Sequence, residues 1–125
     1  MNEYHAKDIR KAPITLNGAA QVVLGQPVQK GDGQYVAILL DGEPVGKLGF
    51  LCRDGELADF VNSEIDERYR GSGIWQLAVQ QLANMFPQGL RAPKYQASMM
   101  AHKAFRKLPT VHETDGAYLV SPVEA

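Results

Sequence analysis

The stretch "ELADFVNSEIDERYRGSGIW", residues 56–75, joins three kinds of sequence within a short distance. It begins with aromatic and β-branched residues typical of a strand, continues through a basic loop that contains Gly71 and Gly73, and ends in an apolar run. A helix start offers unpaired N–H groups and a partial positive charge, and glycine lets a ligand approach the backbone. The stretch therefore predicts a strand, an anion-binding loop and a helix, in that order.

The alternative interpretation of this loop is a solvated turn. A turn explains the glycines, but it does not explain Arg68 and Arg70 beside them at the mouth of a helix. Two familiar phosphate loops do not fit. Ile74 follows Gly73 where a Walker loop has lysine, and Gln76 stands where the dinucleotide fingerprint has its third glycine.

The sequence before this stretch predicts an antiparallel meander. Residues 34–41, 44–52 and 56–65 are apolar or alternating, and Asp-Gly pairs at 41–42 and 54–55 separate them as hairpin turns do. Residues 14–28 resemble a first strand interrupted by turns, and residues 1–13 are expected to be a loose N-terminal arm of a single domain that spans residues 1–125.

The sequence after the loop predicts two helices. Apolar residues follow helical spacing over 73–86, with Ser72 as the expected cap, and again over 98–108, with Ser98 as the expected cap. Residues 89–93 have room for a short strand, and 110–122 predict a terminal hairpin or strand. The fold class is therefore α+β, with helices packed on a mixed, mostly antiparallel sheet.

Composition narrows the classes of function. The net charge is −1 and the pI is near 6.3, so no overall basic field favours nucleic acid. The single Cys52 cannot form an intramolecular disulfide, and the histidines lack metal-ligand spacing, so no metal site is predicted. No signal peptide or membrane-spanning stretch is visible, and a cytoplasmic location is expected.

These residues resemble the GNAT superfamily of acyl-CoA N-acyltransferases. The run from Arg68 to Gly73 is similar to the family's Arg/Gln-x-x-Gly-x-Gly/Ala signature, which follows a strand and opens the helix that carries the coenzyme A pyrophosphate. Residues 98–109 more weakly resemble the family's second helix, and the whole resemblance covers about residues 34–120. It implies a GNAT-like fold and acetyl-CoA as cosubstrate.

The resemblance also implies a cofactor-binding set. The amides of residues 69–73 would bind the pyrophosphate, Ile65 occupies the family's β-branched strand end, and Ser98 stands where the family has an asparagine that holds the pantetheine arm. The full set is Ile65, Arg68, Tyr69, Arg70, Gly71, Ser72, Gly73 and Ser98.

Two departures from the family pattern affect the expected function. Phe105 stands where many members have the tyrosine proposed to protonate the departing thiolate, and a phenyl ring cannot donate a proton. The region before the meander looks too short for the two helices that cover the acceptor site in the family. The acceptor site would then be open, which suits a protein acceptor or a second copy of the chain, in a homodimer, that completes the site.

An acyltransferase needs a base, because only a neutral amine attacks a thioester. Glu64, at the end of the strand before the loop, is the first candidate for this base, with Asp59 and Glu56 further back. Simple alternation along a strand predicts that Glu64 and Asp59 face opposite sides. A solvated carboxylate with no catalytic role is the competing interpretation of Glu64.

The resulting hypothesis is an N-acetyltransferase that uses acetyl-CoA and an amine acceptor, either a protein lysine or a small amine. One alternative is a catalytically degenerate module on the same fold that binds acyl-CoA or a protein partner. The other is an enzyme that acts on nucleic acid, which only the basic residues at 102–107 favour.

Overall fold

The computed structural model describes residues 14–16, 20–52 and 55–123, so the expected arm at 1–13 lies outside the described residues. The strands are β1 (Ile14–Leu16), β2 (Ala20–Leu24), β3 (Val28–Lys30), β4 (Gly33–Leu40), β5 (Glu43–Cys52), β6 (Ala58–Ile65), β7 (Leu90–Pro93), β8 (Val111–Glu113) and β9 (Ala117–Val120). The helices are α1 (Ile74–Asn84) and α2 (Met99–Arg106), and η2 (Glu67–Tyr69) and η3 (Lys94–Gln96) are single 3₁₀ turns.

The described strands join in one sheet with the order β1-β2-β4-β5-β6-β7-β9-β8, and β3 pairs with β4. Every pairing is antiparallel except that between β6 and β7. The predicted α+β class, the meander and the terminal hairpin are confirmed. Both helices are shorter than predicted, and the region 14–28 contains parts of three short strands rather than one interrupted strand.

The turn between β4 and β5 shows why the sequence forms this meander. Asp41 and Gly42 both have positive φ, at 50° and 87°, as the two central residues of a type I′ hairpin turn require. Asp-Gly is a preferred pair for this conformation, since glycine has no Cβ penalty and aspartate tolerates it. The second predicted turn includes Asp54, which lies outside the described residues.

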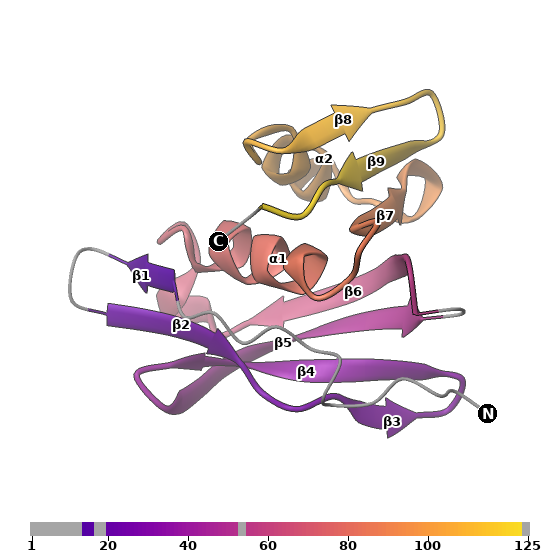
Figure 1. Ribbon diagram of the computed structural model, residues 1–125. Helices are drawn as coiled ribbons and strands as arrows, with labels where there is room; N and C mark the ends of the chain where they lie inside the picture. The colour runs from indigo at the N-terminus through magenta and orange to yellow at the C-terminus, as the bar shows by residue number, and fades with distance from the viewer. Residues whose placement is uncertain (1–13, 17–19, 53–54, 124–125) are drawn as a thin grey trace.

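The hydrophobic core lies between α1 and one face of the meander, and Figure 1 shows α1 lying across that face. Alternate residues of β4 and β5 supply the sheet side of this core, where Val36, Ile38, Leu48 and Phe50 are fully buried. The helix contributes Ile74, Ala78, Val79 and Leu82, which follow the predicted helical spacing. Neither helix of the described chain is long and apolar enough to cross a membrane.

The parallel contact between β6 and β7 is short. Ala58 pairs with Leu90 and Asp59 pairs with Arg91, and the two strands then diverge. Pro93 ends β7 and has no N–H group to extend a ladder, and η3 turns the chain away directly afterwards. In Figure 1, β7, β9 and β8 accordingly rise away from the lower strands.

Candidate functional site

The divergence leaves one edge of β6 open inside the sheet. β6 stays paired with β5 from Ala58 to Ile65, but β7 accompanies it only at Ala58 and Asp59. Over residues 60–65, no described strand pairs with the other edge of β6. Backbone N–H and C=O groups need hydrogen-bond partners, so this edge can bind an extended ligand much as a sheet edge binds a peptide strand.

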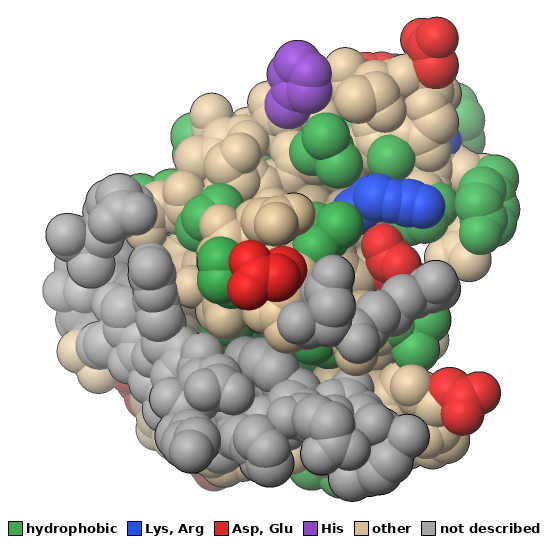
Figure 2. Space-filling view, turned by 45° about the vertical axis from the view of Figure 1, so that its right-hand side comes forward, with side chains coloured by type: hydrophobic (Ala, Val, Ile, Leu, Met, Phe, Trp, Pro, Cys, Tyr) green, Lys and Arg blue, Asp and Glu red, His purple; other side chains and the backbone are tan. Residues whose placement is uncertain are grey.

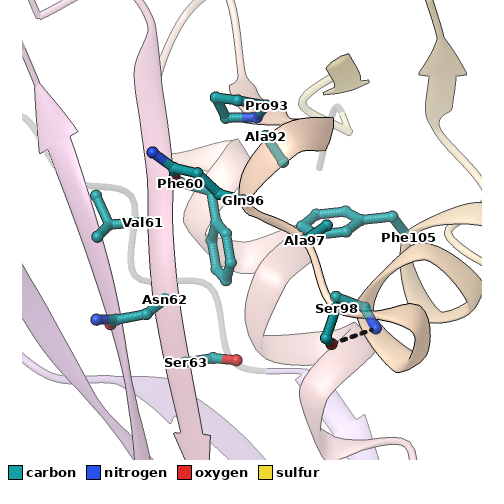
Figure 3. Close-up of a pocket in the computed structure, with 11 residues that line it drawn as sticks. Phe60, Val61, Asn62, Ser63, Ala92, Pro93, Gln96, Ala97, Ser98 and Phe105 are labelled. Carbon is teal, nitrogen blue, oxygen red and sulfur yellow. Dashed lines mark hydrogen bonds between the residues drawn. The ribbon is translucent and has the colours of Figure 1, made fainter. Parts of the chain in front are cut away.

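A cavity of about 200 Å³ lies beside the open edge of β6. Figure 3 shows that the side chains of Phe60 and Ser63 point into it, whereas those of Val61 and Asn62 point away across the strand. The opposite wall comes from the end of β7, η3 and the start of α2. The lining residues are Phe60, Val61, Asn62, Ser63, Ala92, Pro93, Gln96, Ala97, Ser98, Ala101 and Phe105.

A β-bulge in β6 explains these directions. Gly49 of β5 pairs with Asn62 and the next residue, Phe50, pairs with Phe60, so Val61 is an extra residue. Val61 and Asn62 therefore point to the same side of the sheet, as Figure 3 shows. The bulge lies on the strand that borders the cavity, so the backbone is distorted there.

The bulge corrects the prediction that Glu64 and Asp59 face opposite sides. Glu64 pairs with Lys47 and Asp59 pairs with Leu51, and these two β5 residues lie four positions apart on one face. Both carboxylates therefore lie on the face of the sheet opposite to α1. The simple alternation of side chains does not hold across the bulge, because one extra residue moves every following side chain to the other face of the sheet.

The two predicted carboxylates differ in their surroundings. The Glu64 side chain is 74% exposed, with its Oε2 3.7 Å from Lys47 Nζ. The Asp59 side chain is only 21% exposed, with its Oδ1 3.6 Å from Arg91 Nε. Neither residue lines the cavity itself, but both lie on the side to which Val61 and Asn62 point.

The glycine loop after β6 presents a defined set of backbone donors. The amides of Tyr69, Arg70 and Ser72 already donate to carbonyl groups of the loop, and that of Arg68 donates to Asp66 Oδ1 at 3.0 Å. Within the described residues, no acceptor is found for the amides of Gly71, Gly73, Trp75 and Gln76. The free donors thus begin at Gly71 and continue into the first turn of α1, where the helix dipole favours an anion.

Gly71 and Gly73 have φ values of 77° and 93°, which other residues adopt only with strain. Open space lies where a Cβ of Gly71 would be. Ser72 is not the helix cap that the sequence predicted, because Gly73 holds that position in the left-handed conformation. The Ser72 hydroxyl instead donates to Tyr69 O at 2.6 Å and accepts from Ile74 N at 3.4 Å.

The two loop arginines have different roles. The Arg68 guanidinium donates to Asp66, at 3.2 Å between Nη2 and Oδ2, and lies over the Tyr69 ring. This hydrogen bond lowers the pKa of the Asp66 carboxyl and raises that of Arg68. Arg70 makes no such hydrogen bond to an acidic side chain of the described residues, but its charge also acts on Asp66 and helps to lower the pKa of that carboxyl.

The wall on the α2 side combines the predicted cap with aromatic packing. Ser98 caps α2 as predicted, since its Oγ accepts from Ala101 N at 3.1 Å. Phe105 is 1% exposed and stacks on Tyr118, with ring centroids 5.3 Å apart. The Tyr118 hydroxyl lies 2.5 Å from His102 Nδ1, and Tyr118 does not line the cavity.

The remaining predicted site residues lie close to the open edge. Ile65, the last residue of β6, packs against the core, and Tyr69 of η2 does the same.

Sequence analysis missed Phe60 and Ser63, because it treated β6 as a regular strand with no gap beside it. Pro93 at the end of β7 was the available signal for that gap.

Charge on the visible surface is mixed. Figure 2 shows acidic and basic side chains among hydrophobic and neutral ones on one face. The described part of that face shows no row of basic side chains.

The sequence matches no protein-family model and no curated protein. One solved structure that resembles the chain is the crystal structure of a GNAT family acetyltransferase from Elizabethkingia anophelis with acetyl-CoA bound. The TM-score is 0.47 at 13% sequence identity, over 74% of this chain and 77% of that chain. A similarity at this level does not assign the chain to a family.

Proposed function

We propose that the chain is a GNAT-like N-acetyltransferase that transfers an acetyl group from acetyl-CoA to an amine. The observation that carries the proposal is the open edge of β6 beside the cavity, which leads directly to the free amides of Gly71 and Gly73. A ligand with an extended arm that ends in a pyrophosphate can lay the arm along the open edge and place the pyrophosphate on these amides. CoA has that chemistry.

Each part of the site then has a role in binding. The amides of Gly71, Gly73 and the first turn of α1 hold the pyrophosphate, and Arg70 supplies a charge-assisted hydrogen bond. The open edge of β6 pairs with the amides of the pantetheine arm. Backbone N–H groups at the Val61 bulge stabilise the oxyanion that develops on the thioester carbonyl.

The acceptor amine approaches from the opposite face of the sheet. Val61 and Asn62 border the cavity while their side chains point to that face, and Glu64 and Asp59 lie on the same face. Either carboxylate, directly or through water, takes the ammonium proton so that the neutral amine attacks the thioester carbon. The acceptor is a protein lysine or a small amine.

The second candidate function is binding of acyl-CoA without catalysis. Phe105 favours it, because this buried ring supplies no proton to the cavity that it lines. Turnover of acetyl-CoA on a panel of amines separates the two functions. Binding without turnover on any amine favours the binding module.

Both candidate functions require binding of acetyl-CoA, and calorimetric titration with acetyl-CoA tests it. In Gly71→Asn, asparagine tolerates positive φ and its side chain enters the open space where the phosphate is expected. We expect affinity to fall about 10- to 100-fold, the worth of one lost charge-assisted hydrogen bond.

Gly31→Asn is the matched control for this experiment. Gly31 also has positive φ, at 61°, with open space at its Cβ, but it lies in the turn between β3 and β4. Its acetyl-CoA affinity should equal that of the wild type. If Gly71→Asn also binds as tightly as the wild type, the loop is only a turn.

A further inference from the structure

The Ser63 hydroxyl is a hydrogen-bond donor that the structure aims into the cavity. Ser63 lines the cavity, and its Oγ accepts a hydrogen bond from Trp75 Nε1 at 3.0 Å. The indole N–H can only donate, so the serine oxygen is the acceptor and its own proton stays available. No acceptor for that proton is found among the described residues, and Figure 3 shows the oxygen directed away from β6 toward the α2 side.

Apart from Ser63 and Ser98, the polar side chains of the lining are Asn62, which points away from the cavity, and Gln96, which donates to Tyr95 Oη at 3.3 Å. Phe60 and Phe105 meet edge to face at 5.4 Å, and the facing wall includes Ala97 and Ala101. The Ser98 Oγ accepts from Ala101 N at the start of α2, on the wall that faces β6. An anion released among apolar side chains is costly without a donor. When the amine displaces CoA, the C–S bond breaks and its electron pair leaves on sulfur, so a thiolate forms at the inner end of the arm.

We propose that Ser63 donates a hydrogen bond to the CoA sulfur and stabilises the thiolate as it leaves. Trp75 acts as a positioning residue, since its indole fixes the serine rotamer. The serine hydroxyl is a much weaker acid than a thiol, so it keeps its proton, and the thiolate is protonated by solvent after release. This inference rests on the proposed function, because it requires CoA in the cavity.

The test is the pKa of the CoA thiol when CoA is bound, followed through the ultraviolet absorbance of the thiolate. A donor to the thiolate lowers this pKa, so Ser63→Ala should raise it by about 1 to 2 units relative to wild type. Turnover should fall by about tenfold or more. Ser63→Thr keeps the hydroxyl and should restore most of the wild-type pKa.

Two further variants separate this role from packing. Ser121→Ala removes an exposed hydroxyl that does not line the cavity and should leave the bound thiol pKa unchanged. Trp75→Phe keeps an aromatic ring but loses the N–H donor, and it should raise the thiol pKa by less than Ser63→Ala. Combining Trp75→Phe with Ser63→Ala should add nothing to the effect of Ser63→Ala, because both act through one hydroxyl.

The outcomes distinguish this inference from the proposed function. A wild-type chain that does not bind CoA overturns both. CoA that binds with the same thiol pKa in wild type and Ser63→Ala overturns only the role of Ser63. Weaker CoA binding in Ser63→Ala without a pKa shift means that the hydroxyl contacts the arm rather than the sulfur, and this also overturns it.

Discussion

One extra residue in β6, Val61, decides which side chains face the cavity and which face the acceptor side. Phe60 and Ser63 point into the cavity, whereas Asp59 and Glu64 share the other face. Without the bulge, Asp59 and Glu64 would lie on opposite faces of the strand. With it, Ser63, the proposed donor to the leaving sulfur, lies on one face of the strand, and Asp59 and Glu64, the proposed bases, lie on the other.

The base assignment is tested by Glu64→Gln, which keeps the size of the side chain and removes its ability to take a proton. We expect kcat to fall by about 10² to 10⁴, the usual range for general-base catalysis. The loss should shrink as pH rises, because more of the amine is then neutral without assistance. Acetyl-CoA affinity should change little, since Glu64 does not line the cavity.

Asp59→Asn is the matched comparison, because it makes the same change of charge on the same face of β6. If Asp59→Asn carries the loss of kcat and Glu64→Gln does not, the base is Asp59. Full turnover in both variants would assign proton removal to water.

Some of these residues were predictable from local sequence and others were not. Gly71 and Gly73 favour positive φ because they are glycines, and the place of Ser98 before an apolar run predicts a helix cap. The bulge at Val61 left no such mark, because "FVNSE" is compatible with a regular strand. Its register depends on the pairing with β5, which is a tertiary property.

Among the elements, α1 and α2 begin in different ways, and the difference has a measurable consequence. Ser98 caps α2 by a side-chain hydrogen bond at 3.1 Å, whereas Gly73 begins α1 with no side-chain cap. Ser98→Ala should lower the free energy of unfolding by about 1 kcal/mol, and Ser98→Asp should restore it, as both serine and aspartate cap well. Urea denaturation measures both effects.

Ser72→Ala serves as the contrasting variant at the start of α1. Its hydroxyl accepts only a 3.4 Å hydrogen bond from Ile74 N and donates to Tyr69 O at 2.6 Å within the loop, so its loss should cost the helix less than that of Ser98. An equal or larger loss of stability in Ser72→Ala would contradict this and would mean that the two hydrogen bonds of Ser72 together matter as much as the Ser98 cap.

The meander and helices were predictable at the element scale, but the open edge between β6 and β7 was not. Asp-Gly turns and apolar spacing are local signals, and they gave the correct order of strands and helices. The parallel pairing of β6 with β7 joins residues some thirty positions apart, such as Ala58 and Leu90. No local pattern encodes where that pairing ends, apart from Pro93.

For the molecule as a whole, the cavity exists because β7, β8 and α2 are held together away from the lower strands. Glu113 of β8 connects three elements: its carboxylate accepts from Arg106 of α2 at 2.9 Å and from Lys94 of η3 at 2.7 Å. These hydrogen bonds, that of Arg106 first, lower the pKa of Glu113 from 4.5 to about 2. The carboxylate therefore braces the wall that carries Ser98 and Phe105.

This brace should depend on pH in a defined direction. A carboxyl whose folded pKa lies below its unfolded value stabilises the fold above the unfolded pKa of 4.5, and this contribution is lost as pH falls toward about 2. Wild type should therefore be more stable than Glu113→Gln at neutral pH, and most of the difference should be lost by pH 2. Thermal unfolding over this range measures it, and a double-mutant cycle with Arg106→Gln assigns it to the pair. A difference that persists undiminished at pH 2 would mean that Glu113 acts by packing rather than by its charge.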